Sequence, residues 1–279
     1  MVQIPITKVE MGCLCVNSQK EQTIDEGEST IQQYEASLGF SHLPVDVIIA
    51  ALEETSGQGK FNLQLLRTWL SKLNISTDRL NNESDSVACM YATFLEKGRY
   101  SICKLGLLAL LLGEGSAERK ATLLFRLYCK SSKDLVHTDV ESMVETAFDI
   151  ALQQLPSLVE KETIALRDID VLRKLQKYRE RLVKSSNQLQ SSLLQTFLAS
   201  SYSEAEFVEL VKTNAACLVS AQSLRTYACT DFLEPTKESS MSQPSSVTPH
   251  SQTNLRVKNS KARTTMERSV KTPRSNRHS

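Results

Sequence analysis

The sequence lacks any apolar run long enough to cross a membrane. The longest, Leu105–Leu112, falls far short of the roughly 20 residues that a helical span requires. No secretory signal is recognisable either. The seven cysteines are odd in number and mostly far apart, and the four histidines do not cluster with cysteine pairs. We therefore expect reduced thiols in a cytoplasmic protein, with neither a disulfide framework nor a zinc site.

Strand-type alternation and glycine are also scarce. All nine glycines precede residue 116, and apolar residues recur at spacings of three and four rather than two. An apolar share of 41% is enough for a core over most of the chain. Pro44 and Pro156 are each expected near a helix start. These features predict an all-α fold, with a helical body that begins near Ser29 as N-cap.

We divide the chain by composition into four parts. Residues 1–29 are polar and predict a flexible leader, and residues 30–155 and 156–233 hold the helical units. Within the second helical part, residues 157–193 predict one long, highly charged connecting helix docked on the body. Its heptad series is too short for a clean coiled coil, so a dimer seam is the weaker interpretation. Residues 234–279 predict a disordered basic tail, because they contain few large apolar side chains.

The charge of the chain is nearly balanced at +1, but it is unevenly placed. Nine Lys or Arg and two acidic residues follow Thr236. The tail lacks aromatic residues between its basic ones, so we expect no specific nucleic-acid binding. It has Thr-Pro sites at Thr248 and Thr272, where phosphorylation would offset the positive charge. An inert solubilising tail is the other interpretation.

The region around residues 118–145 has the outline of an EF-hand, a helix–loop–helix motif. A calcium loop needs oxygen ligands at positions 1, 3, 5 and 9 and a glutamate at position 12. Counted from Cys129, these positions hold a thiol, a hydroxyl, a cation, an imidazole and a hydrocarbon: Cys129, Ser131, Lys133, His137 and Val140. The motif is predicted to keep its shape without its metal chemistry, so we predict no metal site.

Three further helix–loop–helix units show the same pattern. We expect helices over 45–54 and 63–73, over 86–95 and 103–112, and over 189–199 followed by a helix through Lys212. The ligand positions of loop one hold Glu54, Ser56, Gln58, Asn62 and Leu65. Loop two has the cations Lys97 and Arg99 where anionic ligands belong. Loop four keeps Glu206 at position 12, but its first three ligand positions hold Gln195, Phe197 and Ala199. Each loop has an apolar residue near position 8, where EF-hands pair through a short ribbon: Phe61, Tyr100 or Ile102, Val136 and Tyr202.

The order of these segments resembles the EF-hand region of the dystrophin, utrophin, dystrobrevin and dystrotelin family. The similar stretches are residues 47–52 with 65–70, residues 97–110, residues 117–125, and residues 206–224. Degenerate EF-hand pairs in some ubiquitin proteases and GTPase-activating proteins have a similar order of segments. The resemblance implies a calcium-independent helical scaffold in a membrane–cytoskeleton complex, with helical or peptide segments of other proteins as partners.

The chain departs from this family in two places. Its one tryptophan, Trp69, lies within a predicted helix, so no WW domain precedes the helical units. No Cys-x-x-Cys series of a ZZ domain follows residue 230. In this family, binding to a membrane receptor depends on the WW and ZZ domains. We therefore do not expect this binding activity for the present chain. Trp69 and Tyr91 are most simply core aromatics, with a peptide groove as the other interpretation.

A second hypothesis concerns membrane attachment. If translation began at Met11, Gly12 would be placed to accept myristate and Cys13 and Cys15 to accept palmitate, which gives stable anchoring. Otherwise these residues belong to the leader. The alternative function is thus a regulator attached to the membrane periphery or the cytoskeleton through an acylated start or the basic tail.

An enzyme is not expected, and we predict no cofactor. Cys129 and His137 have no third group to orient them, and the sequence shows neither a Gly-rich phosphate loop nor paired catalytic carboxylates.

Overall fold

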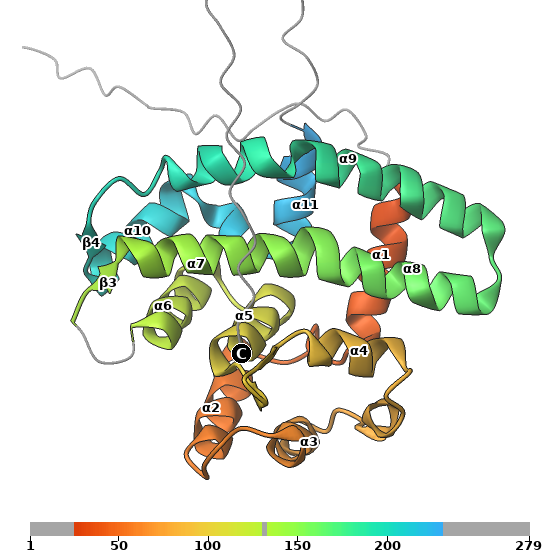
Figure 1. Ribbon diagram of the computed structural model, residues 1–279. Helices are drawn as coiled ribbons and strands as arrows, with labels where there is room; N and C mark the ends of the chain where they lie inside the picture. Colours follow the sequence, from red (N-terminus) through yellow and green to blue (C-terminus); the bar gives the residue numbers. More distant parts are fainter. Residues whose placement is uncertain (1–24, 130–132, 231–279) are drawn as a thin grey trace, which may run out of the picture. The chain divides into compact units, whose positions relative to one another are not determined.

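The computed structural model describes residues 25–129 and 133–230, and these form an all-α body (Figure 1). The predicted fold class is confirmed. The α-helices are α1 Glu26–Ser37, α2 Val45–Ser56, α3 Leu63–Lys72, α4 Ser86–Ala92, α5 Ile102–Leu112, α6 Ala117–Tyr128, α7 His137–Phe148, α8 Leu155–Leu166, α9 Ile169–Leu194, α10 Glu204–Asn214 and α11 Ala221–Thr230. Two 3₁₀ turns, η1 Asp78–Asn81 and η3 Ala216–Val219, and a π-helical turn, η2 Asp149–Gln154, complete the helical set. The strands are β1 Leu95–Glu96, β2 Arg99–Tyr100, β3 Leu135–Val136 and β4 Ser201–Tyr202.

The first two helix–loop–helix units, α2–α3 and α4–α5, meet through their loops. The backbone N–H of Tyr100 donates to the carbonyl of Phe61 at 2.8 Å. Loop two is itself a hairpin of β1 and β2, joined by Lys97 and Gly98. Both residues have positive φ, at 52° and 75°, as a type I′ turn requires. The predicted contact positions Phe61 and Tyr100 are therefore correct.

Units three and four pair through a two-stranded ribbon between their loops. Strand β3 lies antiparallel to β4, with Leu135 opposite Tyr202 and Val136 opposite Ser201. Helices α6 and α10 pack against each other beside this ribbon. Arg126 of α6 and Glu204 of α10 form an ion pair at 3.1 Å. The sequence predicted this ribbon at Val136 and Tyr202.

The expected single helix over 157–193 is wrong. The structure has two helices, α8 and α9, that pack against each other. Between them Arg167 adopts a left-handed conformation with φ of 59°. The carboxylate of Asp168 then accepts a hydrogen bond from the N–H of Val171 at 3.1 Å, which caps α9. A left-handed residue followed by an N-cap is enough to reverse the chain without glycine or proline.

Pro156 is the second residue of α8 and so lies near a helix start, as predicted. Helix α7 continues through η2 into α8, so Pro156 stands within a long helical stretch, which is green in Figure 1. A proline removes one amide donor from such a stretch. Just before it, the N–H of Leu155 donates to the carbonyl of Ile150, in the wider π spacing. Pro44 is the N-cap residue of α2, also as expected.

The helical body begins earlier than predicted. Helix α1 starts at Glu26, and its N-cap is Asp25, whose carboxylate accepts from the N–H of Gly27 at 2.9 Å. Ser29 is therefore inside the helix, and residues 26–29 do not belong to a leader. The predictions made for residues 1–24 and for the tail from residue 231 concern parts of the chain outside the described residues. Within the described part, no helix is both long and apolar enough to span a bilayer.

Candidate functional site

Loop four shows most directly which side chains occupy the predicted calcium-ligand positions. Position 3 holds Phe197, which is fully buried and stacks on Phe207 with ring centroids 6.0 Å apart. Tyr202 meets Phe197 edge to face, also at 6.0 Å, and Phe125 of α6 lies 6.0 Å from Phe207. An aromatic cluster thus occupies the inside of the loop where an oxygen ligand would stand.

The glutamate at position 12 of loop four has a different task. The carboxylate of Glu206 accepts from the N–H of Ser203 at 2.9 Å and from its hydroxyl at 2.7 Å. The Ser203 hydroxyl accepts in turn from the N–H of Glu206, which completes a capping box at the start of α10. These hydrogen bonds lower the pKa of Glu206. The carboxylate is therefore committed to the helix end.

Loop three has an equally apolar lining. Val140, at position 12, is fully buried in the core. At position 9, the N–H of His137 donates to the carbonyl of Ser200 at 3.0 Å, which ties loop three to loop four. The Nε2 atom of His137 lies 3.4 Å from Glu141 on the same helix. The loop's side chains serve packing and pairing.

The candidate ligands of loops one and two are also used elsewhere. Asn62 caps α3 by accepting from the N–H of Leu65 at 3.0 Å, and Glu54 pairs with Lys72 at 2.8 Å. In the hairpin of loop two, Glu96 pairs with Lys104 at 2.9 Å. Across residues 25–129 and 133–230, no three His, Cys, Asp or Glu side chains gather closely enough to hold a metal ion.

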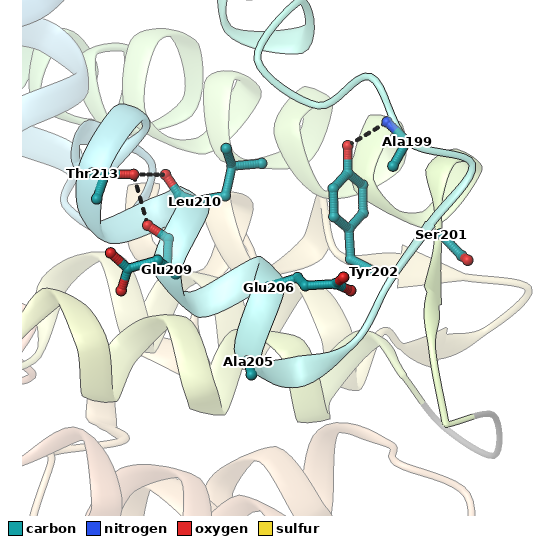
Figure 2. A pocket seen from close by; sticks show the side chains of 8 residues that line it. All are labelled: Ala199, Ser201, Tyr202, Ala205, Glu206, Glu209, Leu210 and Thr213. Carbon is teal, nitrogen blue, oxygen red and sulfur yellow. Dashed lines mark hydrogen bonds between the residues drawn. The ribbon is translucent and has the colours of Figure 1, made fainter.

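A groove lies beside this loop pair, along the outer side of α10 (Figure 2). Its volume is about 560 Å³, and it is lined by Ala199, Ser201, Tyr202, Ala205, Glu206, Glu209, Leu210 and Thr213. The lining residues of α10 recur at helical spacing, so they share one face. Its charged lining groups, Glu206 and Glu209, are both acidic. The groove offers an apolar floor with carboxylates at its edge.

The walls of this groove are fixed by hydrogen bonds. Figure 2 shows the Tyr202 hydroxyl accepting from the N–H of Ala199, at 2.8 Å. The Thr213 hydroxyl donates to the carbonyl of Glu209 at 2.8 Å. Loop and helix thus hold the groove in one shape, while its buried side is secured by Phe207 and Val211 in the core.

A second hollow, of about 370 Å³, lies between α4 and the η2–α8 stretch. Its lining is mostly polar and includes Cys89, Thr93, Asp149, Gln154 and Lys161. The amide of Gln154 accepts a hydrogen bond from the Thr93 hydroxyl at 3.1 Å, which links the two walls. We find no base within this set that is placed to activate the Cys89 thiol, whose hydrogen bond goes to the carbonyl of Glu83.

The residues predicted for modification all lie outside the described part of the chain. These are Gly12, Cys13 and Cys15 for acylation, and Thr248 and Thr272 for phosphorylation. Trp69 and Tyr91, taken as core aromatics, are fully and almost fully buried, and the Trp69 indole donates to the carbonyl of Ile48 at 3.3 Å. The sequence analysis did not predict the groove beside α10. The capping box of Ser203 and Glu206, which marks the start of this helix, can nevertheless be recognised in the sequence.

The comparisons with known proteins found no match to this chain. No protein-family model matches the chain, and neither a curated protein nor a solved structure is similar to it.

Proposed function

We propose that this chain is a calcium-independent, EF-hand-like scaffold that binds a segment of another protein. One observation carries the proposal: loops three and four pair through a short ribbon, as EF-hand loops do, while the side chains at the predicted ligand positions are used for other contacts. Phe197 is in the core, Glu206 caps α10, and Asn62 caps α3. Such loops hold helices in place rather than respond to an ion.

The groove beside α10 is the surface that we assign to partner binding. A concave, mostly apolar site with a few fixed polar groups is the usual form of a binding site for peptides or small molecules. Here the fixed groups are the carboxylates of Glu206 and Glu209. A helical or extended segment with an apolar anchor next to a basic residue would complement both features.

The setting of this activity follows from the family resemblance. Dystrophin-type EF-hand regions suggest a cytoplasmic complex near the membrane or the cytoskeleton, and we propose that setting for this chain. Cys89 and Cys103 form no disulfide, and their thiols donate hydrogen bonds to carbonyls at 3.4 and 3.5 Å, which is compatible with a reducing compartment.

Calcium independence is tested by thermal unfolding of the full chain with millimolar calcium and with a chelator. We expect midpoints within about 1 °C of each other, because only a ligand that binds the folded state raises the midpoint. Isothermal titration with calcium should give no saturable heat. A rise of several degrees with calcium, or a micromolar isotherm, would contradict the proposal.

The groove is tested by comparing captured partners of three full-length forms in chelator. Leu210→Asp places a charge in the groove floor, and the matched control Leu166→Asp changes a leucine that is 72% exposed at the end of α8. We expect partners to be retained by the wild type and the control and lost from Leu210→Asp. Equal capture by all three forms would exclude this groove as the binding surface.

A further inference from the structure

The most unusual side chain in the described body is Arg225, on α11. It is fully buried and held between two glutamates of α1. Its Nε and Nη2 atoms donate to Glu28 at 2.7 and 3.0 Å, and Nη1 and Nη2 donate to Glu35 at 2.7 and 3.0 Å. Glu28 and Glu35 are seven residues apart, so they lie two turns apart on one face of α1. A single guanidinium therefore bridges two carboxylates.

Two further groups complete this cluster. The Tyr178 hydroxyl of α9 donates to Glu28 at 2.7 Å, and Arg225 Nη1 also donates to the carbonyl of Ala151 in η2 at 3.4 Å. Helix α1 and η2 thus present acceptors to one arginine, and α9 supplies a hydroxyl to one of those acceptors. With two acids and one base the cluster is unbalanced, and burial raises the pKa of Glu35.

Apart from Arg225, α11 buries one large apolar side chain fully, Leu224, and packs Tyr227 and Cys229 against the core while they stay partly exposed. Its buried side chains are Ala221, Leu224, Arg225 and Ala228, at positions i, i+3, i+4 and i+7 of one face. Two of these are methyl groups, which bring little hydrophobic free energy. A helix of ten residues is also too short to be stable on its own in water. Its docking therefore combines this packing with the arginine contacts.

Buried ion pairs of this kind give specificity more than net stability. The cost of removing the charges from water offsets most of their attraction, so a correctly paired cluster contributes little net free energy. A wrongly paired helix, in contrast, would leave two carboxylates buried without a partner. The contact thus discriminates among helices, because a helix without a matching arginine would leave both carboxylates buried and unpaired.

The segment before α11 is suited to act as a hinge. The 3₁₀ turn η3 is held by Lys120, whose Nζ donates to the carbonyl of Val219 at 3.2 Å. The next residue, Ser220, is extended, with φ of −150° and ψ of 125°. A change of backbone angles at Ser220 moves α11 while η3 stays anchored.

We propose that the site formed by α1, α9 and η2 is a helix-receiving groove that α11 fills as an internal ligand. The external ligand is a partner helix with an arginine flanked by leucine one residue before it and by alanines four residues before and three after. Such a helix displaces α11 and places its arginine between Glu28 and Glu35. This site is separate from the groove beside α10, so either proposal stands if the other fails.

A labelled synthetic peptide of residues 216–230 tests the proposal in trans on the full-length protein. In wild type, α11 competes with the peptide; in the Arg225→Ala variant the internal ligand is weakened. We expect the variant to bind the peptide at least about tenfold more tightly than the wild type does, measured by fluorescence anisotropy. A peptide carrying Arg225→Ala itself is the matched control and should bind at least about tenfold more weakly.

Hydrogen exchange measured on the wild type tests the proposal even if the Arg225→Ala variant does not fold. Amides of α11 should exchange through a local opening, faster than those of Leu182–Leu193 in α9, whose protection reports global unfolding. Equal protection of both helices would overturn the proposal. So would a folded variant that binds neither peptide, or one that binds both peptides equally.

Discussion

Arg225 donates to the carbonyl oxygen of Ala151, 3.4 Å away, at the point where the α7–α8 stretch lacks an amide. The bond from the N–H of Leu155 to the carbonyl of Ile150 sets the π spacing. The next donor in that spacing would be residue 156, which is proline and has no N–H. A buried carbonyl without a partner is costly, so the arginine of α11 compensates a gap in another helix.

Replacing Arg225 with methionine should destabilise the protein because it leaves Glu28 and Glu35 buried without their cation. We expect the free energy of unfolding to fall by at most about 3–5 kcal/mol, with smaller losses if α11 separates and the carboxylates become hydrated. Denaturant unfolding measures this change.

The control for that experiment removes the whole cluster at once. Glu28→Leu and Glu35→Leu added to Arg225→Met should recover most of the lost stability, because no buried charge then lacks a partner. A triple variant less stable than Arg225→Met alone would show that the ionic cluster itself contributes substantial stability.

A second prediction concerns Gly27, where α1 approaches α9 most closely. A Cβ atom at this position would lie 2.6 Å from the Cβ of Tyr178, so α1 would have to move. Gly27→Ala should therefore lower the free energy of unfolding by about 1–3 kcal/mol, as overpacking usually does.

Gly57, at the end of α2, provides the matched substitution. Its φ is −65°, and an added Cβ would meet only backbone oxygens at 3.7 and 3.8 Å. Gly57→Ala should be neutral or stabilise by about 0.4–1 kcal/mol through the unfolded chain. Chemical denaturation of both variants measures the contrast, and equal losses would contradict the close α1–α9 contact.

The helical units and their pairing were predictable because their signals are local. Apolar residues at three- and four-residue spacing define each helix, and position 8 of each loop marks the ribbon. Val136 and Tyr202 both lie in this ribbon although they are far apart in sequence, but the register is shifted by one residue and pairs Tyr202 with the buried Leu135. Pairing of EF-hand-like loops follows a general geometry, so the contact could be foreseen from two separate loops.

The turn at Arg167 was not predictable from its composition. It has neither glycine nor proline, and apolar spacing continues from α8 into α9. Only the N-cap residue Asp168 signals a new helix, and an aspartate in a charged helix is common. The packing of α8 on α9 selects the left-handed residue, and that packing is tertiary.

The burial of Arg225 could not be predicted from the sequence either. Its partners Glu28 and Glu35 lie 197 and 190 positions away, and a lone arginine on an amphipathic helix is normally solvated. Two glutamates seven residues apart in α1 look equally ordinary. The cluster exists only because α1 and α11 both pack against α9.

A third prediction addresses the aromatic cluster of loop four. Phe197→Ala removes a fully buried ring between Phe207 and Tyr202, and it should lower the free energy of unfolding by about 3–5 kcal/mol. Phe197→Asp restores an oxygen at position 3 but buries a charge, so it should cost more and still gain no stability from calcium. Unfolding with calcium and with chelator tests both variants, and calcium rescue of Phe197→Asp would contradict the interpretation of the loop.

The last prediction concerns pH and the capping box of α10. Hydrogen bonds from Ser203 lower the pKa of Glu206 from its ordinary value of 4.5. Between the lowered folded pKa and 4.5 the unfolded chain binds more protons than the folded one, so stability falls as pH falls through this window. Above pH 4.5 the contribution of the charged carboxylate is fully present.

Glu206→Gln should remove this part of the pH dependence. The stability difference between wild type and variant should therefore be largest above pH 4.5 and should shrink as acid protonates Glu206 in the folded protein. Urea unfolding at a series of pH values measures it, and Glu209→Gln controls for the loss of one negative charge from α10. If Glu206→Gln and wild type differed by the same amount at every pH, the carboxylate would not be the group that caps α10, and position 12 of loop four would again be open to another role.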